Sequence, residues 1–207
     1  MTKNTLVIPA GEQHPSAILR AVEILKNGGT VAFPTDTVYG LAAAVSSSET
    51  IEALFAIKER PQDRAIAVLL GRIEDLAQVT QNPGPAALEL AERFWPGPLT
   101  LVVPKHHGIP ANISPRPTIG VRIPDHPVAL ALLQNTGPLA VTSANLSGQA
   151  NTSTAAEVIA QLGGRIDLVL DGGNTPGGLP STVVDMTGET PAILREGPIS
   201  AQQLFTA

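Results

Sequence analysis

Residues 30–41 read TVAFPTDTVYGL, a short apolar run of the β type followed by a turn that carries several hydroxyl groups. Residues 138–148, PLAVTSANLSG, have the same arrangement. In each segment the apolar run predicts a strand, so the Thr and Ser side chains come where that strand ends. Because α/β sheets bind ligands at strand ends, we expect the functional site in these two segments.

The rest of the chain alternates between helical and strand-like patterns. Apolar residues at helical spacing predict helices over 16–26, 48–59, 84–94, 126–135 and 153–162. Apolar runs predict strands over 30–33, 66–70, 99–103, 118–123, 139–142, 167–170, 181–185 and 192–195. This alternation predicts an α/β sheet with helices packed on it. The last two strands follow each other directly and predict a hairpin, so we expect the sheet to be mixed.

Capping residues set the expected ends of three helices. The glycine pair at 28–29 predicts the end of the first helix. Ser46 and Glu49 have the spacing of a capping box and predict the start of the second helix. Thr152 or Ser153 is the expected cap of the last helix.

The composition favours one compact domain over residues 1–207. Charged residues make up 15% of the chain, against about 25% in an average globular protein. The chain has no cysteine, which excludes disulfides, thiolate metal sites and a cysteine nucleophile. Its net charge of −5 argues against a protein that holds nucleic acid by bulk electrostatics.

The N-terminal stretch MTKNTLVIPAGEQ lacks the apolar segment of a signal peptide. No run in the sequence approaches the roughly 18 apolar residues that a membrane span requires. We therefore expect a cytoplasmic protein with no membrane partner.

Four basic residues lie beside turn-forming residues, namely Lys58, Arg60, Arg122 and Arg195. Most Lys and Arg side chains are simply surface charges. For Arg122 and Arg195 a function is favoured, because each ends an apolar β-like run, where ligand contacts are common. For Lys58 and Arg60 the residues alone leave both interpretations open.

The stretch DGGNTPGGLPSTVVD, residues 171–185, could form an anion-binding concavity. A plain mobile loop explains the same glycines, and composition alone favours that interpretation. The chain has no Walker motif, no strand-linked G-x-G-x-x-G and no G-x-S-x-G. The residues alone therefore indicate an α/β protein with a hydroxyl-lined, partly cationic cleft for a small polar anion or a nucleotide phosphate.

Seven motifs of the chain occur together in a known order: PTDTVYGL, KERP, FWPGPLT, GVRIPDHP, TSANLSG, DGG…STVVD and ILREG. In this order and spacing the chain resembles the YrdC-like family of L-threonylcarbamoyladenylate synthases, from about residue 15 to residue 200, and its length is similar to the family's single-domain type. The resemblance implies an open, twisted α/β sheet with a large concave cavity. It also implies synthesis of threonylcarbamoyl-AMP and pyrophosphate from L-threonine, bicarbonate and ATP, for modification of the adenosine next to the tRNA anticodon.

The resemblance also implies roles for particular residues. By motif position the threonine-binding set is Thr35, Arg122, Thr142 or the adjoining backbone at Val141, and Ser181. The ATP-binding set is Lys58, Thr118, Ser143, Asn151 and Arg195. The candidates for stabilising charge during the reaction are Lys58, Arg60 and Arg195. No residues are expected to form a metal site, and Mg²⁺ is expected to arrive with ATP.

Three other functions stay open at this point. A related enzyme would use carbamoyl phosphate to make a carbamoyl-adenylate. A non-catalytic RNA-binding module would contact phosphates through the same cations, and a regulatory protein would bind a nucleotide without turnover. For the synthase, the expected partners are the proteins that transfer the threonylcarbamoyl group to tRNA, with a possible contact to tRNA or other RNA.

Overall fold

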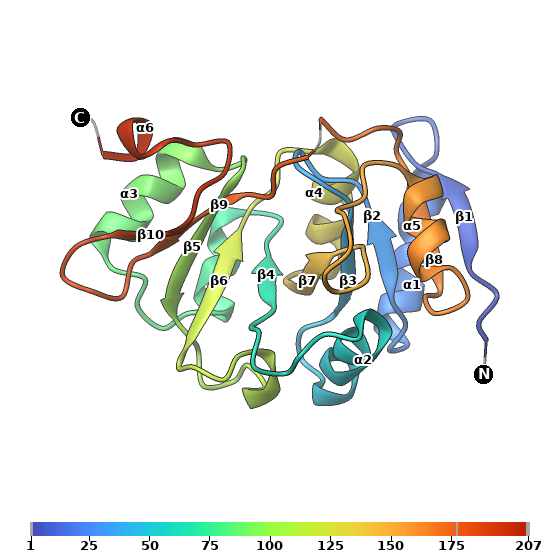
Figure 1. The fold of residues 1–207 in the computed structure, drawn as a ribbon, viewed down its shortest axis with the longest axis horizontal. Coiled ribbons are helices and arrows are strands. Elements are labelled where there is room, and N and C mark those ends of the chain that lie inside the picture. Colours follow the sequence, from blue (N-terminus) through green and yellow to red (C-terminus); the bar gives the residue numbers. More distant parts are fainter. Residues whose placement is uncertain (1, 177, 206–207) are drawn as a thin grey trace.

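The computed structural model describes residues 2–176 and 178–205 (Figure 1). Its strands are β1 (Leu6–Pro9), β2 (Val31–Phe33), β3 (Gly40–Ala44), β4 (Ala67–Leu69), β5 (Leu99–Pro104), β6 (Thr118–Arg122), β7 (Leu139–Ser143), β8 (Leu168–Asp171), β9 (Thr182–Asp185) and β10 (Ala192–Arg195). Its helices are α1 (Pro15–Lys26), α2 (Ser48–Lys58), α3 (Pro85–Phe94), α4 (Pro127–Thr136), α5 (Ala155–Leu162) and α6 (Ala201–Phe205), with 3-10 helices η1 (Ile73–Gln78) and η2 (Ala111–Ile113).

The strands form one ten-stranded sheet in the order β1-β8-β2-β3-β7-β4-β6-β5-β9-β10. β1 and β10 are the two edges, so the sheet is open and does not close into a barrel. The pairs β1 with β8 and β4 with β6 are parallel, whereas β2 with β3, β3 with β7 and β9 with β10 are antiparallel. The predictions of a mixed α/β sheet and of a C-terminal hairpin are therefore confirmed.

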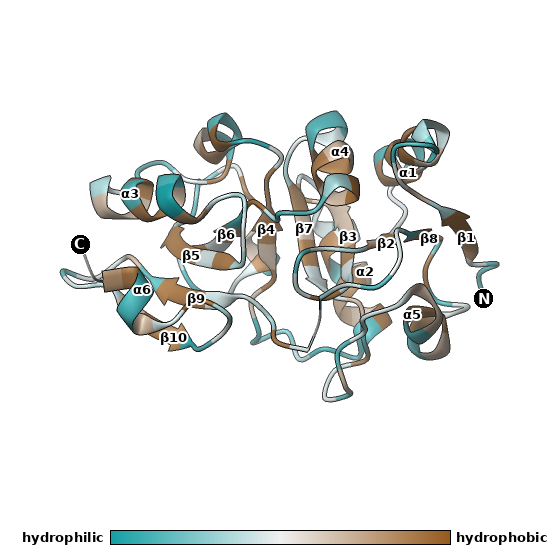
Figure 2. Cartoon of the chain, turned by 90° about the horizontal axis from the view of Figure 1, so that it is seen from above, coloured by the Kyte–Doolittle hydropathy of each residue, from teal (hydrophilic) through white to brown (hydrophobic). Residues whose placement is uncertain are grey.

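The helices pack on this sheet through two clusters of buried apolar residues. One cluster joins α1 and α4 to the strands, and includes Val22 and Leu132. The other includes Leu54 of α2, Leu90 of α3 and Val158 of α5. Figure 2 shows α1 and α4 on one side of β2, β3 and β7, and α5 on the other side. Among the described residues, no helix is both long enough and apolar enough to span a bilayer.

The helix α2 begins at Ser48, as predicted, but its capping residue differs from the prediction by one position. The cap is Ser47 and not Ser46, since the Ser47 hydroxyl accepts a hydrogen bond from the Thr50 amide at 3.3 Å. Glu49 accepts a hydrogen bond from that same hydroxyl at 2.6 Å. The acidic residue therefore contacts the capping side chain, whereas in a capping box it would accept from a backbone amide.

The cap of α5 was also predicted wrongly. Thr154, and neither Thr152 nor Ser153, caps the helix, and its hydroxyl and the Glu157 carboxylate form a capping box. Thr152 is fully buried and donates instead to the Ala144 carbonyl at 3.1 Å. The end of α1 agrees with the prediction, because Gly28 follows the helix with a φ of 79°.

Sequence patterns missed β1, β3, α6 and the two 3-10 helices. β3 reads GLAAA, and Gly and Ala are depleted in strands because they offer little side-chain packing. The strand nevertheless forms, since β2 and β7 pair with it on its two sides. Tertiary pairing thus overrides a weak local preference at the centre of the sheet.

The pairing of β3 with β7 brings the two hydroxyl-rich segments together. Gly40 lies opposite Ser143, and Leu41 lies opposite Thr142. A Cβ atom at position 40 would come within 2.9 Å of the Val141 side chain, so this close approach requires glycine. Thr142 and Ser143 are the last two residues of β7, which extends one residue beyond the predicted strand 139–142, so Ser143 belongs to the strand and not to the loop after it.

Beyond β10, the C-terminal segment is attached to β9 by a single buried hydroxyl. Thr182 has no exposed surface; its hydroxyl donates to the Ile199 carbonyl at 2.9 Å and accepts from the Ile199 amide at 3.0 Å. This double contact fixes the chain that follows the β9–β10 hairpin.

Thr182→Val should therefore destabilise the protein although it preserves the side-chain shape. The substitution leaves a buried amide and a buried carbonyl without partners, which should lower the free energy of unfolding by about 2 kcal/mol. Urea denaturation would measure the change, with Thr190→Val at an exposed threonine as the matched control. Equal midpoints for the two variants would show that the contact contributes nothing to stability.

Candidate functional site

The candidate site is a cavity of about 330 Å³ that lies across the sheet between β3 and β10. Of the residues expected at the site, the structure places these in its lining: Thr35, Arg60, Arg122, Val141, Thr142, Ser143, Asn151, Ser181 and Arg195. Lys58 and Thr118 do not line it. The structure thus shows that these residues line one cavity, whereas the role of each residue stays a prediction.

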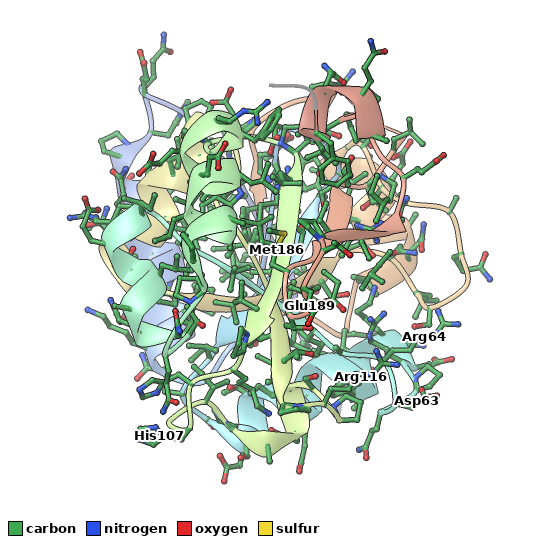
Figure 3. The ribbon with its side chains drawn as sticks, turned by 90° about the vertical axis from the view of Figure 1, so that its left-hand side faces the viewer. Asp63, Arg64, His107, Arg116, Met186 and Glu189 are labelled. Atoms are coloured by element: carbon green, nitrogen blue, oxygen red, sulfur yellow. The ribbon has the colours of Figure 1, made fainter. Side chains whose placement is uncertain are left out.

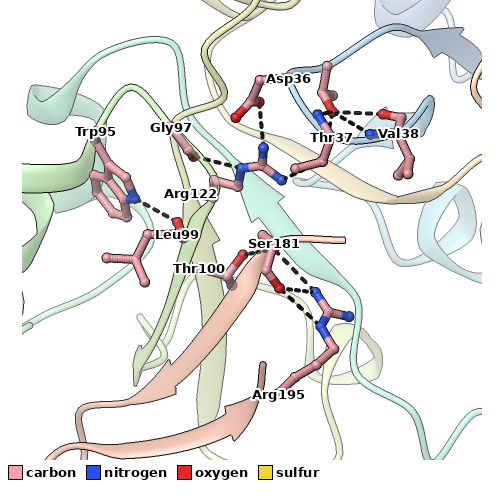
Figure 4. Close-up of polar contacts among 11 residues, drawn as sticks. Asp36, Thr37, Val38, Trp95, Gly97, Leu99, Thr100, Arg122, Ser181 and Arg195 are labelled. Carbon is pink, nitrogen blue, oxygen red and sulfur yellow. Dashed lines mark hydrogen bonds and ion pairs between the residues drawn. The ribbon is translucent and has the colours of Figure 1, made fainter. Parts of the chain in front are cut away.

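Arg122 is the most buried of the cavity cations, with 6% of its surface exposed. It lies at the end of β6, and its guanidinium forms an ion pair with Asp36 at 2.5 Å (Figure 4). It also donates to the Thr37 hydroxyl at 3.1 Å and to the Gly97 carbonyl at 2.9 Å. Burial lowers the pKa of Arg122, and the Asp36 charge opposes that shift. The guanidinium is thus held rigidly, with N–H groups left for a ligand.

Asp36 balances only part of the positive charge. One of its carboxylate oxygens receives the Arg122 contact, while the other is buried without a hydrogen-bond partner among the described residues. Arg60 and Arg195, which also line the cavity, form no ion pair within that same part of the chain. The cavity therefore favours an anionic ligand.

Arg195 is the last residue of β10 and lines the cavity, where Ser181 holds its guanidinium group. Its guanidinium donates to the Ser181 carbonyl at 2.8 and 3.1 Å and to the Ser181 hydroxyl at 3.2 Å (Figure 4). Partial burial lowers the pKa of Arg195. The Ser181 hydroxyl lies 2.7 Å from that of Thr100, a cavity residue on β5.

Arg60 bounds the cavity from the turn that follows α2. It donates to the backbone carbonyls of Arg64 at 3.3 Å and Ala65 at 2.8 Å, and so holds the exposed loop 61–65. Burial lowers the pKa of Arg60, and the charge of Arg64 adds to the effect while that of Asp63 opposes it. Figure 3 shows Asp63 and Arg64 at the surface of the molecule.

Hydroxyl groups form the polar side of the lining. The Thr35 hydroxyl donates to the Val38 carbonyl at 2.7 Å and accepts from the amides of Thr37 and Val38, so it shapes the turn after β2. Thr37 and Thr100 also line the cavity, although neither was among the site residues predicted from the sequence motifs. Thr37 lies within the quoted PTDT motif, and Thr100 ends FWPGPLT, so the sequence did carry a signal for both.

Lys58 and Thr118 lie apart from the cavity lining. Thr118 starts β6 and pairs with Pro104. Lys58 is 1% exposed, and its ammonium donates to the Ser143 carbonyl at 2.5 Å, to the Asn145 carbonyl, and to the Asn145 side chain at 3.2 Å. Asn145, which sequence reasoning did not select, thus contacts Lys58 directly.

The glycine-rich loop between β8 and β9 is attached to the body of the protein. The Tyr39 hydroxyl donates to the Gly173 carbonyl at 2.7 Å, and the Thr175 amide donates to the Ser153 carbonyl at 2.9 Å. Burial and the nearby Asp171 charge raise the pKa of Tyr39 to about 12, so its hydroxyl remains a donor at neutral pH. Gly177 of this stretch lies outside the described residues.

In residues 2–176 and 178–205, no group of three or more His, Cys, Asp or Glu side chains is placed to hold a metal ion. The donor set of the cavity consists of guanidinium, hydroxyl and amide groups, whereas Mg²⁺ in proteins prefers carboxylate and phosphate oxygens. These residues do not fit a metal held by the protein alone.

Comparison with known proteins gives the relatives of this chain. A threonylcarbamoyl-AMP synthase of Bacillus subtilis is 41% identical over 196 residues, which cover 90% of this chain and 55% of that protein. A Mycobacterium tuberculosis relative is 38% identical over 194 residues, which cover 93% of this chain and 89% of the relative. The chain therefore spans little more than half of the first relative and most of the second.

A solved structure shares the fold. The crystal structure of P. abyssi Sua5 complexed with L-threonine matches with a TM-score of 0.89 and 34% identity, covering 100% of this chain and 61% of that one. The sequence model of the Sua5/YciO/YrdC family, described as "Telomere recombination", matches residues 23–197. On this match and these identities, the chain belongs to the Sua5/YciO/YrdC family.

Proposed function

We propose that the protein joins L-threonine, bicarbonate and ATP into L-threonylcarbamoyl-AMP and pyrophosphate. The observation that carries the proposal is one cavity that combines hydroxyl groups with the three guanidinium groups of Arg60, Arg122 and Arg195. Threonine offers a hydroxyl and a carboxylate, and ATP offers phosphates, so this lining matches both substrates. The 34% identical Sua5 of P. abyssi binds L-threonine in its crystal structure, which supports the assignment.

The threonine half of the proposed site surrounds Arg122. Its planar fork, held by Asp36, suits the α-carboxylate of an amino acid. Thr35, Thr142 and Ser181 supply hydroxyl groups to the lining of the same cavity. A pocket lined by hydroxyl groups can hydrogen-bond to the hydroxyl of the substrate. Such a pocket discriminates against an analogue that lacks this hydroxyl more strongly than apolar contacts would.

The ATP half is assigned to Arg60 and Arg195, together with Ser143 and Asn151 of the same cavity lining. Bicarbonate takes up a proton and loses water to give CO2, and the threonine amine bonds to the CO2 carbon and releases a proton, which forms the N-carboxylate. In the adenylation step an oxygen of this N-carboxylate attacks the α-phosphorus. The new P–O bond forms as the bond to the β-phosphate breaks, and the electron pair leaves with pyrophosphate. The attacking oxygen is already ionised, so no general base is needed. Positioning and charge neutralisation by the two guanidiniums would accelerate this displacement.

Mg²⁺ belongs to the proposal only as the counter-ion that ATP carries in solution. Since the cavity residues do not fit a protein-held metal, no step is assigned to one. The proposed product would pass to proteins that transfer the threonylcarbamoyl group to tRNA in the cytoplasm. Because the net charge of the chain is −5, any direct contact with tRNA would depend on local clusters of basic residues.

Pyrophosphate release from ATP should require threonine and bicarbonate together. We would incubate the purified chain with α-labelled ATP, omit one component at a time, and identify the products by mass spectrometry. The label should appear in a threonylcarbamoyl-AMP only when all three substrates are present. Carbamoyl phosphate should not replace the pair. Formation of ADP, or RNA binding without any turnover, would point to one of the other functions.

Arg195→Gln should weaken ATP binding while the fold remains intact. Losing a charge-assisted contact to phosphate costs about 1.5–3 kcal/mol, which corresponds to roughly tenfold or more in the dissociation constant. Isothermal titration calorimetry would measure it, with Arg72→Gln at an exposed arginine as the control. Native ATP affinity in Arg195→Gln would remove this residue from the ATP half of the site.

Ser181→Ala should weaken threonine more than ATP. Two of the three Arg195 contacts go to the Ser181 carbonyl, so this variant removes the hydroxyl and keeps the arginine anchored. The native protein should also discriminate strongly against 2-aminobutyrate, which lacks the substrate hydroxyl. Steady-state kinetics with both amino acids would measure the discrimination. Comparable use of 2-aminobutyrate would show that the pocket does not read that group.

A further inference from the structure

Thr100 is a cavity residue whose hydroxyl group meets another hydroxyl of the lining. It is the second residue of β5, it is 7% exposed, and it lines the cavity. Its Oγ1 lies 2.7 Å from the Oγ of Ser181, which is 5% exposed and lines the same cavity (Figure 4). Within residues 2–176 and 178–205 the Thr100 hydroxyl forms no other hydrogen bond. The two hydroxyl groups are therefore a buried pair at the cavity surface.

Both members of this pair are held in place by contacts within the chain. The Thr100 methyl group packs against β6, where a Cβ atom at Gly120 would lie 3.1 Å from it. The Ser181 carbonyl accepts two hydrogen bonds from Arg195, and a Cβ atom at Gly197 would come within 2.7 Å of the Ser181 carbonyl carbon. Strand β9 begins at the next residue and pairs with β5. The positions of the two hydroxyl oxygens are thus set before a ligand binds.

The hydrogen-bonding capacity of the pair can be counted. Each hydroxyl has one proton and two lone pairs. One proton and one lone pair are used between the two oxygens, and Arg195 donates to a second lone pair, on the Ser181 oxygen, at 3.2 Å. One proton and two lone pairs remain, whichever of the two hydroxyls donates to the other. The pair can therefore both donate to a ligand in the cavity and accept from it.

This capacity matches a hydroxyl group better than it matches either ionised group of an amino acid. A carboxylate only accepts, so it would face the unused lone pairs, and an ammonium only donates, so it would face the unused proton. A hydroxyl accepts the free proton of the pair and donates its own proton to a free lone pair. Because both protein hydroxyls are almost fully buried, a ligand without this group would leave them unpaired at a cost in binding.

We propose that Thr100 is a specificity-determining residue, which together with Ser181 binds the β-hydroxyl of the amino-acid substrate. The carboxylate of the same substrate is then left for Arg122, whose N–H groups suit it. The role of Thr100 rests on the proposed function, because that function puts an amino acid in the cavity. The geometry of the hydroxyl pair does not rest on it, since the pair is a contact within the chain.

The test compares Thr100→Val with the native protein on threonine, 2-aminobutyrate and serine. Valine keeps the shape of threonine and removes the hydroxyl. We expect kcat/KM for threonine to fall about tenfold or more, as for a lost hydrogen bond to a buried group, while that for 2-aminobutyrate stays within about twofold of native. The ratio of threonine to serine should remain native, because both substrates carry the hydroxyl. A general disturbance of the fold would instead lower all three values alike.

Two further variants separate specificity from stability. Thr100→Ser keeps the hydroxyl and should retain the native preference for threonine over 2-aminobutyrate. Thr80→Val is the matched control, because the Thr80 hydroxyl is also buried, donates to the Pro104 carbonyl at the other end of β5, and does not line the cavity. This control should lower the midpoint of urea unfolding and leave the preference unchanged. Should Thr100→Val fail to fold, Thr100→Ala removes the same hydroxyl and should show the same loss of preference.

A native preference in Thr100→Val would overturn the inference. So would an equal loss for all three amino acids, or a lost preference in Thr100→Ser. If the native chain bound threonine without turning it over, the same ratios would be measured as dissociation constants by calorimetry. A native chain that neither bound threonine nor released pyrophosphate in its presence would overturn the proposed function, and the assignment of Thr100 with it. Failure of the inference alone is thus distinguished by a native protein that prefers threonine.

Discussion

The antiparallel pairing of β3 with β7 is the contact on which the site depends. It places Gly40 opposite Ser143 and so joins two segments that are about a hundred residues apart in the sequence. The pairing continues beyond the strands, because the Ala144 amide donates to the Tyr39 carbonyl at 2.8 Å and the Tyr39 amide donates to the Thr152 carbonyl at 2.9 Å. One wall of the cavity is therefore built from backbone hydrogen bonds, and its hydroxyl groups are fixed by the sheet register.

The opposite wall of the cavity carries the positive charges of Arg122 and Arg195. Arg122 is buried against Asp36, while Arg195 is anchored mainly on a backbone carbonyl and brings its charge to the cavity without an acidic partner in the described residues. A cation held by carbonyl oxygens keeps most of its field available to a ligand, whereas one paired with a carboxylate does not. The two arginines therefore suit different tasks: Arg122 suits rigid recognition of a small carboxylate, and Arg195 suits neutralisation of phosphate charge.

Much of this arrangement could be predicted from the sequence. Strands with β-branched apolar runs, such as β5 and β6, were found from pattern alone, whereas β3 was missed because Gly and Ala carry no local β signal. The motif residues gather around one cavity because they lie at or beside the ends of neighbouring strands. The neighbours of those residues were not predictable in the same way. Thr100 meets Ser181 across 81 positions of sequence, and only the pairing of β5 with β9 sets that contact.

Lys58 and Arg60 belong to one motif, but their side chains lie in different surroundings. Lys58 is the last residue of α2, and Glu59 follows it in the left-handed conformation with a φ of 53°. Few non-glycine residues adopt this conformation, and here it turns the chain sharply between the two cations. Lys58 consequently points inward to the carbonyls of the segment after β7, while Arg60 lines the cavity. Two positive charges two residues apart thus lie in different environments, one satisfied by the protein and one open to an anion.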